Sequence, residues 1–188
     1  MHNIIAIVGM CGVGKSSVSD YLEKKGYKRI YFGGITMEKL KEAGIEVNAE
    51  NEKMMREHLR QELGMGAYAK ILLPRIKASA QEGNTVLDGL YSWDELKVLQ
   101  EEFKDALTVV AIIADKNIRY RRLEKRNGRA LTKEEAIKRD ISEIENIAKA
   151  GPIAYADYYI DNNQSLDDCY RQLDEILKKR EENDNHEY

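Results

Sequence analysis

Short apolar segments alternate along this chain with longer segments in which apolar residues recur every three or four positions. The first segment, Asn3–Val8, is β-branched and apolar at successive positions, which is typical of a strand buried on both faces of a parallel sheet. Four more strands are predicted at residues 27–32, 84–90, 106–115 and 156–162. Strands that alternate with helices predict an α/β fold, a parallel sheet with helices on both faces.

Several helix ends are recognisable in the sequence. The helix after the first strand is expected to stop at Gly26. Ser92–Glu95 and Thr132–Glu135 are capping boxes, which predict that two later helices begin there. An amphipathic closing helix is predicted at residues 165–180, and residues 181–188 are expected to form a frayed tail.

A long helical block interrupts the alternation between the second and third strands. Residues 36–82 carry almost only helical patterns, and Pro74 is expected to break or bend the last of these helices. The length of the chain favours a single domain over residues 1–188, with its core in residues 1–35 and 83–180. The helical block is then an insertion over one end of the sheet.

The turn after the first strand has the phosphate-binding pattern Gly9-x-x-x-x-Gly14-Lys15-Ser16. Glycines let the backbone approach a polyphosphate, and successive N–H groups converge on its oxygens at the positive end of the next helix. Lys15 can reach the β- and γ-phosphates of ATP, and the Ser16 hydroxyl can bind Mg²⁺. The other nucleotide contacts predicted from this loop are made by Gly12, Val13 and Ser17.

Asp88 is predicted at the carboxyl end of the third strand, the edge at which open parallel sheets bind ligands. An acid at this position can hold Mg²⁺ or orient the hydroxyl of a phosphoryl acceptor. The alternative is a turn residue paired with Gly89, because Asp-Gly is a common turn signal. The presence of the P-loop favours the catalytic interpretation.

Four arginines recur in the basic segment that is predicted as a helix ending near Gly128. On a continuous helix, Arg119, Arg122, Arg126 and Arg129 would lie within an arc of about 80°. Such a stripe suits a lid, here residues 119–132, that closes over transferring phosphates, because negative charge spreads over the phosphoryl oxygens in the transition state. The alternative is a solvated basic face or a minor nucleic-acid patch.

A second anion site is predicted in the helical block. Arg56 and Arg60 lie one helical turn apart, and Arg75 follows later in the same block. Arginines so spaced can clamp the phosphate of an acceptor. Because glutamates are interleaved with them, ordinary surface ion pairs are an equally good interpretation.

Composition narrows the class of protein. Formal net charge is −3 over 188 residues, with both signs mixed, so there is no strong signal for nucleic-acid binding. The two cysteines, Cys11 and Cys169, are far apart and have no metal-ligand spacing, which suits a reducing compartment. Neither a signal peptide nor a membrane span is recognisable, so a cytoplasmic protein without membrane partners is expected.

Several sequence blocks together resemble a known family: GMCGVGKS, YFGGITME, RQELGMGAYAK, RNGR and AYADYYIDN. They resemble the P-loop kinases of the nucleoside monophosphate kinase and dephospho-CoA kinase group. The chain is most similar to a largely archaeal, dephospho-CoA-kinase-like family, and the resemblance extends from Ile4 to about Leu177. The P-loop occurs in many unrelated proteins, so the later blocks narrow the match.

The resemblance implies a P-loop NTPase fold with five parallel strands in the order 2-3-1-4-5. It implies that residues 36–82 cover the acceptor, that the lid arginines serve the phosphates, and that the backbone near Asn162 lies close to adenine. One feature departs from the family, in which an arginine commonly follows the Asp-Gly of the third strand. Leu90-Tyr91-Ser92 stands here instead. Either an arginine of the helical block holds the acceptor phosphate, or the acceptor differs.

These observations predict an ATP- and Mg²⁺-dependent kinase that transfers the γ-phosphoryl group to a small-molecule acceptor. The favoured acceptor is a nucleotide or nucleotide-like molecule, of the nucleoside monophosphate or dephospho-CoA type. The alternative function is a nucleotide-binding regulator or slow ATPase that acts through a protein or RNA partner. A kinase should bring two cationic sites to face each other, whereas a regulator needs only one.

Overall fold

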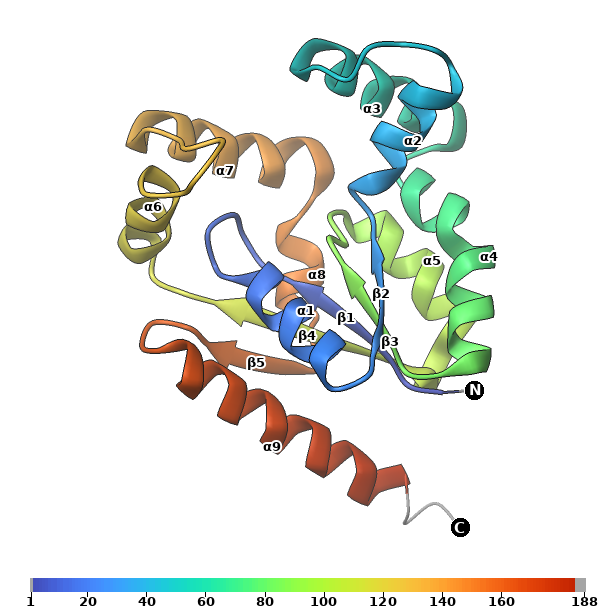
Figure 1. Cartoon of the computed structure of the whole chain (residues 1–188), viewed down its shortest axis with the longest axis vertical. Helices are drawn as coiled ribbons and strands as arrows, with labels where there is room; N and C mark the ends of the chain where they lie inside the picture. The colour runs from blue at the N-terminus through green and yellow to red at the C-terminus, as the bar shows by residue number, and fades with distance from the viewer. Residues whose placement is uncertain (1, 185–188) are drawn as a thin grey trace.

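A computed structural model describes residues 2–184, and its centre is one parallel sheet in the order β2-β3-β1-β4-β5 (Figure 1). The strands are β1 (Ile4–Val8), β2 (Lys28–Tyr31), β3 (Thr85–Asp88), β4 (Leu107–Ile113) and β5 (Tyr158–Asp161). β1 pairs with β3 on one side and with β4 on the other. The strand order and the α/β class predicted from the sequence are thus confirmed.

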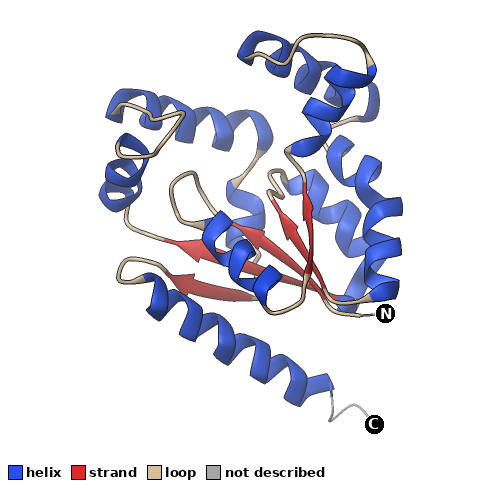
Figure 2. Cartoon of the chain, in the orientation of Figure 1, coloured by secondary structure: helices blue, strands red, loops and turns tan. Residues whose placement is uncertain are grey.

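Helices connect the strands and cover both faces of the sheet (Figure 2). They are α1 (Lys15–Lys24), α2 (Gly34–Glu42), α3 (Ala49–Leu63), α4 (Ala67–Glu82), α5 (Trp93–Phe103), α6 (Lys116–Glu124), α7 (Lys133–Ile147), α8 (Ala150–Ala154) and α9 (Leu166–Asp184), with a 3₁₀ turn at Lys104–Ala106. Both capping boxes form as predicted, at the start of α5 and of α7.

Two hydrophobic cores lie on opposite faces of the sheet because successive side chains of a strand point to opposite sides. Ile4, Ala6 and Val8 of β1 belong to the core under α4 and α5. Ile5 and Ile7 belong to the core under α1 and α9. All five β1 residues are buried, as expected of a central strand in a parallel sheet.

The predicted helical insertion divides into two parts. α4 packs along the sheet, against β2, β3 and α5, whereas α2 and α3 stand beyond the carboxyl ends of the strands (Figure 1). α4 runs through Pro74 as one helix, so Pro74 does not break it, and the bend expected as the alternative stays a prediction. Pro74 is exposed, so the carbonyl that loses its helical N–H partner can bond to water.

The helical prediction fails at two other places. The basic helix α6 ends at Glu124, with Lys125 as its cap, so it does not continue to Gly128. In the other direction, α9 continues to Asp184, past the expected start of a frayed tail, and residues 185–188 lie outside the described part. Within residues 2–184, no helix is both long and apolar enough to cross a membrane.

Candidate functional site

The P-loop joins the carboxyl end of β1 to the first turn of α1, and the Lys15 side chain folds back to bind the start of the loop. The ammonium group of Lys15 donates to the carbonyl oxygens of Gly9 at 2.8 Å and Met10 at 3.0 Å. No carboxylate within residues 2–184 forms an ion pair with Lys15. Ser16 is exposed in the first turn of α1, where the positive end of the helix favours anions.

Two glycines of the loop are required by both conformation and space. Gly12 and Gly14 have φ angles of 82° and 98°, which residues with a Cβ atom rarely adopt. A Cβ atom on Gly12 would lie 2.8 Å from the Arg119 carbonyl oxygen, and one on Gly14 would lie 2.5 Å from Nδ2 of Asn162. The loop is therefore shaped by α6 and by the residues after β5, as well as by its own sequence.

A buried ion pair holds α6 and α7 against the loop. Both terminal nitrogens of Arg119 donate to the Asp140 carboxylate, at 3.0 and 2.5 Å, and Arg119 also donates to the carbonyl oxygen of Cys11 at 2.9 Å. The Tyr120 hydroxyl donates to the same carboxylate at 3.1 Å. Arg119 is thus a structural residue that faces inward, not a member of a solvent-facing stripe.

The predicted one-face arginine stripe is therefore wrong. Arg122 is half-buried and donates to the Asn162 carbonyl oxygen at 2.8 Å. Arg126 and Arg129 follow the end of α6, in the loop of residues 125–132, and are exposed. The helix ends early because Asn127 and Gly128 favour a turn, with Gly128 and Arg129 both at positive φ.

Asn162 anchors the P-loop from the far side. Its side-chain amide donates to the Val13 carbonyl oxygen at 2.7 Å, and its own N–H donates to the Ile113 carbonyl oxygen at 2.9 Å. Only 1% of its surface is exposed. The side chain thus has a role in shaping the loop that the sequence did not suggest, and the adenine contact of its backbone stays a prediction.

Asp88 lies at the carboxyl end of β3, as predicted, and is buried. Its Oδ2 atom pairs with the guanidinium of Arg29 from β2, which also binds Asp20 and Glu23 of α1. The role of Arg29 was not predicted, because β2 and β3 are far apart in the chain and only the sheet brings Arg29 and Asp88 together.

The helices beyond the sheet edge bring together polar groups from four elements. The guanidinium of Arg60 lies 5.6 Å from the ring centroid of Tyr68, whose hydroxyl is 2.6 Å from that of Thr36. Burial raises the pKa of Glu95, at the start of α5, to about 7, and the charge of Arg60 partly opposes this rise. Among the described residues, Nε of Arg60 and Oε1 of Glu95 are buried without a hydrogen-bond partner.

The loop of residues 125–132, which was predicted to be part of a lid, touches α3 through one shared carboxylate. Glu52 lies 3.2 Å from Nη2 of Arg129 and 3.5 Å from Nη1 of Arg56. Arg75 does not join this group, because both of its terminal nitrogens donate to Glu38 on α2, at 2.9 and 2.6 Å. Of the predicted acceptor arginines, Arg56 thus lies near the loop of residues 125–132 and Arg60 lies near Glu95, whereas Arg75 lies elsewhere.

The donor set suits Mg²⁺ bound mainly through phosphates. Within the described residues there is no group of three or more His, Cys, Asp or Glu side chains that could hold a metal ion. Mg²⁺ commonly takes only one or two protein ligands and fills its shell with waters and phosphate oxygens. The Ser16 hydroxyl and the Asp88 carboxylate fit that pattern.

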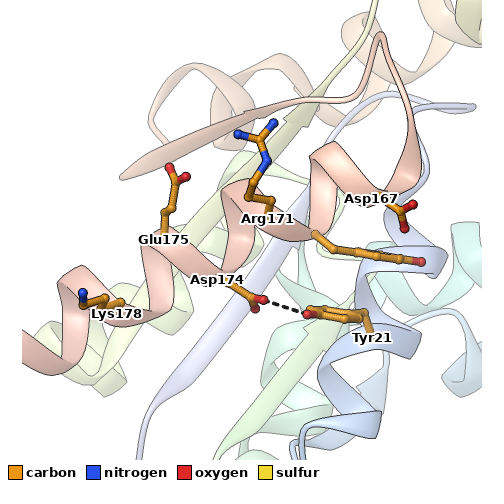
Figure 3. Close-up of a pocket in the computed structure, with 7 residues that line it drawn as sticks. Tyr21, Asp167, Arg171, Asp174, Glu175 and Lys178 are labelled. Carbon is orange, nitrogen blue, oxygen red and sulfur yellow. Dashed lines mark hydrogen bonds between the residues drawn. The ribbon is translucent and has the colours of Figure 1, made fainter.

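A shallow hollow between α1 and α9 lies away from these groups. Figure 3 shows the hydroxyl of Tyr21 bonded to Asp174 across it, and the Tyr21 and Tyr170 rings are stacked with centroids 4.2 Å apart. Asp174 and Arg171 in its lining form ion pairs with Lys25 and Asp168, which lie outside it, and no residue of the P-loop lines it. The hollow is therefore part of the packing contact between α1 and α9.

The profile of the AAA domain family matches residues 5–146. A UPF0200 protein of Sulfurisphaera tokodaii is 34% identical over 183 residues, which cover 94% of this chain and 96% of the relative. A UPF0200 protein of Thermococcus kodakarensis is 32% identical, and the alignment covers 94% of this chain and 99% of the relative.

Two solved structures share the fold at low sequence identity. A gluconokinase from Sinorhizobium meliloti has a TM-score of 0.65 at 17% identity, covering 99% of this chain and 98% of its own. A shikimate kinase from Bacteroides thetaiotaomicron has a TM-score of 0.59 at 14% identity, covering 94% and 98%. These likenesses show a P-loop kinase fold.

The Arg119–Asp140 pair generates a stability prediction. Asp140→Ala should leave a buried guanidinium unpaired and lower the free energy of unfolding by about 3–5 kcal/mol. The double variant Arg119→Met/Asp140→Leu removes both charges and should recover most of that loss. Urea unfolding of the three proteins measures both effects. Equal stability of parent and Asp140→Ala would contradict a structural role for the pair.

Proposed function

This chain belongs to the AAA domain family and to the UPF0200 family, and from that premise we propose that it is an ATP- and Mg²⁺-dependent kinase of a small molecule. The main support is the location of Lys15 and the set of groups that its ammonium contacts. Lys15 is half-buried in a glycine loop at a helix N-terminus, and among the described residues its ammonium group donates to two backbone carbonyls and forms no ion pair. A cation so placed suits a polyphosphate ligand.

The nucleotide end of the reaction is assigned to the P-loop. Backbone N–H groups of residues 9–17 hold the phosphates, Lys15 binds the β- and γ-phosphates, and Ser16 with Asp88 holds Mg²⁺, which neutralises charge that develops during transfer. Arg122 has a terminal nitrogen, Nη1, that is buried without a partner among the described residues. We assign that nitrogen to a phosphate oxygen, and Arg126 and Arg129 to the closing lid.

The acceptor end is assigned to the helices beyond the sheet edge, with a nucleotide or nucleotide-like acceptor of the nucleoside monophosphate or dephospho-CoA type. Arg56 and Arg60 would hold its phosphate, and Asp88 would orient its hydroxyl. The contact of Arg129 and Arg56 with the same Glu52 carboxylate supports this choice over a regulator, because two cationic groups from different elements meet there.

The first test is turnover itself. The parent should release ADP from Mg·ATP in the presence of an acceptor drawn from a panel of nucleotides and dephospho-CoA. Lys15→Ala should lower that turnover at least hundredfold, since it removes a charge that acts on the transition state. The thermal stability of Lys15→Ala should match that of the parent. Lys97→Ala, which removes an exposed lysine, is the control and should match the parent in both turnover and thermal stability. Parent-like turnover of Lys15→Ala would rule out the P-loop mechanism.

The second test uses pH. Burial, together with the charge of Lys149, lowers the pKa of Lys15 from 10.5 to about 7. Phosphates bind the protonated ammonium, so above pH 7 the free protein must take up a proton when it binds nucleotide. The affinity for Mg·ADP should therefore be level below pH 7 and fall by up to tenfold per pH unit above it. Calorimetry in two buffers of different ionisation enthalpy measures the proton uptake.

Lys15→Arg is the matched control for the pH test, because arginine stays protonated throughout this range. Its proton uptake should be absent, whatever its absolute affinity. A parent whose affinity for Mg·ADP does not change between pH 7 and pH 8.5 would contradict the lowered pKa.

The third test addresses the acceptor. Arg60→Ala should raise the acceptor KM tenfold or more, because a charge-assisted hydrogen bond contributes about 1.5–3 kcal/mol, with little change in ATP affinity. Lys53→Ala on the same helix, where 72% of the side chain is exposed, should behave like the parent. Steady-state kinetics with varied acceptor at saturating ATP measures both. An unchanged KM in Arg60→Ala would assign Arg60 to packing on Tyr68.

A further inference from the structure

Lys149 is a lysine that the fold buries almost completely, with 2% of its surface exposed. Its ammonium group lies 2.6 Å from a carboxylate oxygen of Glu143 and 5.1 Å from the ring centroid of Tyr91. Lysine is rarely buried so deeply. An ammonium group has three N–H donors, and Glu143 accepts only one of them.

The Glu143 carboxylate is shared between two cations. Nε of Arg139 donates to it at 3.0 Å, so one positive charge of this trio has no carboxylate of its own. Burial alone would raise the pKa of Glu143, but the charge of Lys149 lowers it, and the carboxylate is ionised. The trio therefore carries a net positive charge at the end of α7, the helix that Arg119 ties to the P-loop through Asp140 and the Cys11 carbonyl oxygen, and the charge of Lys149 helps to lower the pKa of Lys15.

The position of Tyr91 shows where that charge lies. Tyr91 comes three residues after Asp88, and its ring packs against Gly89, whose Cβ would be 3.0 Å from the Tyr91 hydroxyl. The segment Leu90-Tyr91-Ser92 that follows β3 contains no cation of its own. Lys149 thus places an ammonium group beside the segment that follows Asp88 at the carboxyl end of β3.

The backbone holds Lys149 in this inward orientation. Ala148 ends α7 in the left-handed conformation, with a φ angle of 50°, and the Lys149 N–H donates to the Glu143 carbonyl oxygen at 3.2 Å. A non-glycine residue in this conformation is unfavourable by about 1 kcal/mol or more. α8 begins directly after Lys149 and packs on α5, so the backbone is fixed on both sides of the lysine.

We propose that Lys149 is a catalytic residue that donates hydrogen bonds to the oxygens of the phosphoryl group during transfer. Lys15 donates to the same phosphoryl group from the P-loop. The inference rests on the proposed kinase function. In the step, the bond from the γ-phosphorus to the bridging oxygen of ADP breaks while the bond to the acceptor oxygen forms, and the acceptor hydroxyl releases its proton to solvent. Lys149 takes no part in the proton transfer and supplies only charge and hydrogen-bond donors.

A purely structural role makes a different prediction. If Lys149 served only to neutralise Glu143, removing both charges together would restore stability and turnover alike. The decisive comparison is therefore Lys149→Met against Lys149→Met/Glu143→Gln, with the exposed Lys97→Met as control. Three quantities are measured: melting temperature, the Kd for Mg·ADP by calorimetry, and ADP release from Mg·ATP with and without the acceptor panel.

Lys149→Met should lose stability, because the largely buried Glu143 carboxylate then keeps only the half-exposed Arg139 as a partner, and the double variant should regain part of that loss, because that carboxylate is gone. Both should bind Mg·ADP within about threefold of the parent, and both should turn over at least a hundredfold more slowly. Lys149→Arg keeps the ion pair with Glu143 but moves the donors, so it should fold and still lose at least tenfold in kcat. If the methionine variants do not fold, Lys149→Arg alone distinguishes a catalytic role of Lys149 from a structural one.

Parent-like turnover in the double variant, or in Lys149→Arg, would overturn the proposal. This failure differs from failure of the kinase function itself. In that case the parent would release no acceptor-dependent ADP with any member of the panel. Its slow hydrolysis of Mg·ATP would still report on Lys149, because water then replaces the acceptor at the same phosphorus.

Discussion

The P-loop passes through a space in which side chains do not fit, and the rest of the site depends on that confinement. The carbonyl of Arg119 crowds Gly12, and the amide of Asn162 crowds Gly14. These contacts come from α6 and from the residues after β5, so the loop takes its shape only when the whole sheet has assembled. A loop fixed in this way holds its N–H groups in place before any ligand arrives, which is the condition for electrostatic catalysis without reorganisation.

The charges around the loop follow from the same confinement. Burying a guanidinium or ammonium group is tolerable only when an anion meets it, and Asp140 does so for Arg119 and Asp88 for Arg29. Lys15 has no such partner among the described residues, and the carboxylate beside Lys149 is shared with Arg139. The sheet edge thus retains positive charge that the protein does not neutralise. An anionic ligand would neutralise it, and its binding would then favour the folded chain.

The parts of the structure that could be predicted from sequence are those governed by local patterns. Capping boxes, the β-branched first strand and the glycine loop are each contained in a few consecutive residues. Lys149, Arg29 and the side chain of Asn162 could not be found in that way, because their partners lie in distant segments that only the sheet brings together. The arginine stripe failed for a local reason: the periodicity continued past Glu124, but the turn-forming Asn127 and Gly128 ended the helix.

That early end of α6 changes how a lid could work. α6 itself is tied to the P-loop and α7 by the buried Arg119–Asp140 pair, so only residues 125–132 extend beyond it. The contact of this loop with α3 is the pair of Arg129 with Glu52, in which 80% of the arginine side chain is exposed. An exposed pair contributes at most about 1 kcal/mol, so a phosphate can replace Glu52 at little cost. Closure then requires a change of partner for one arginine in a short loop, and the helices that hold the P-loop stay in place.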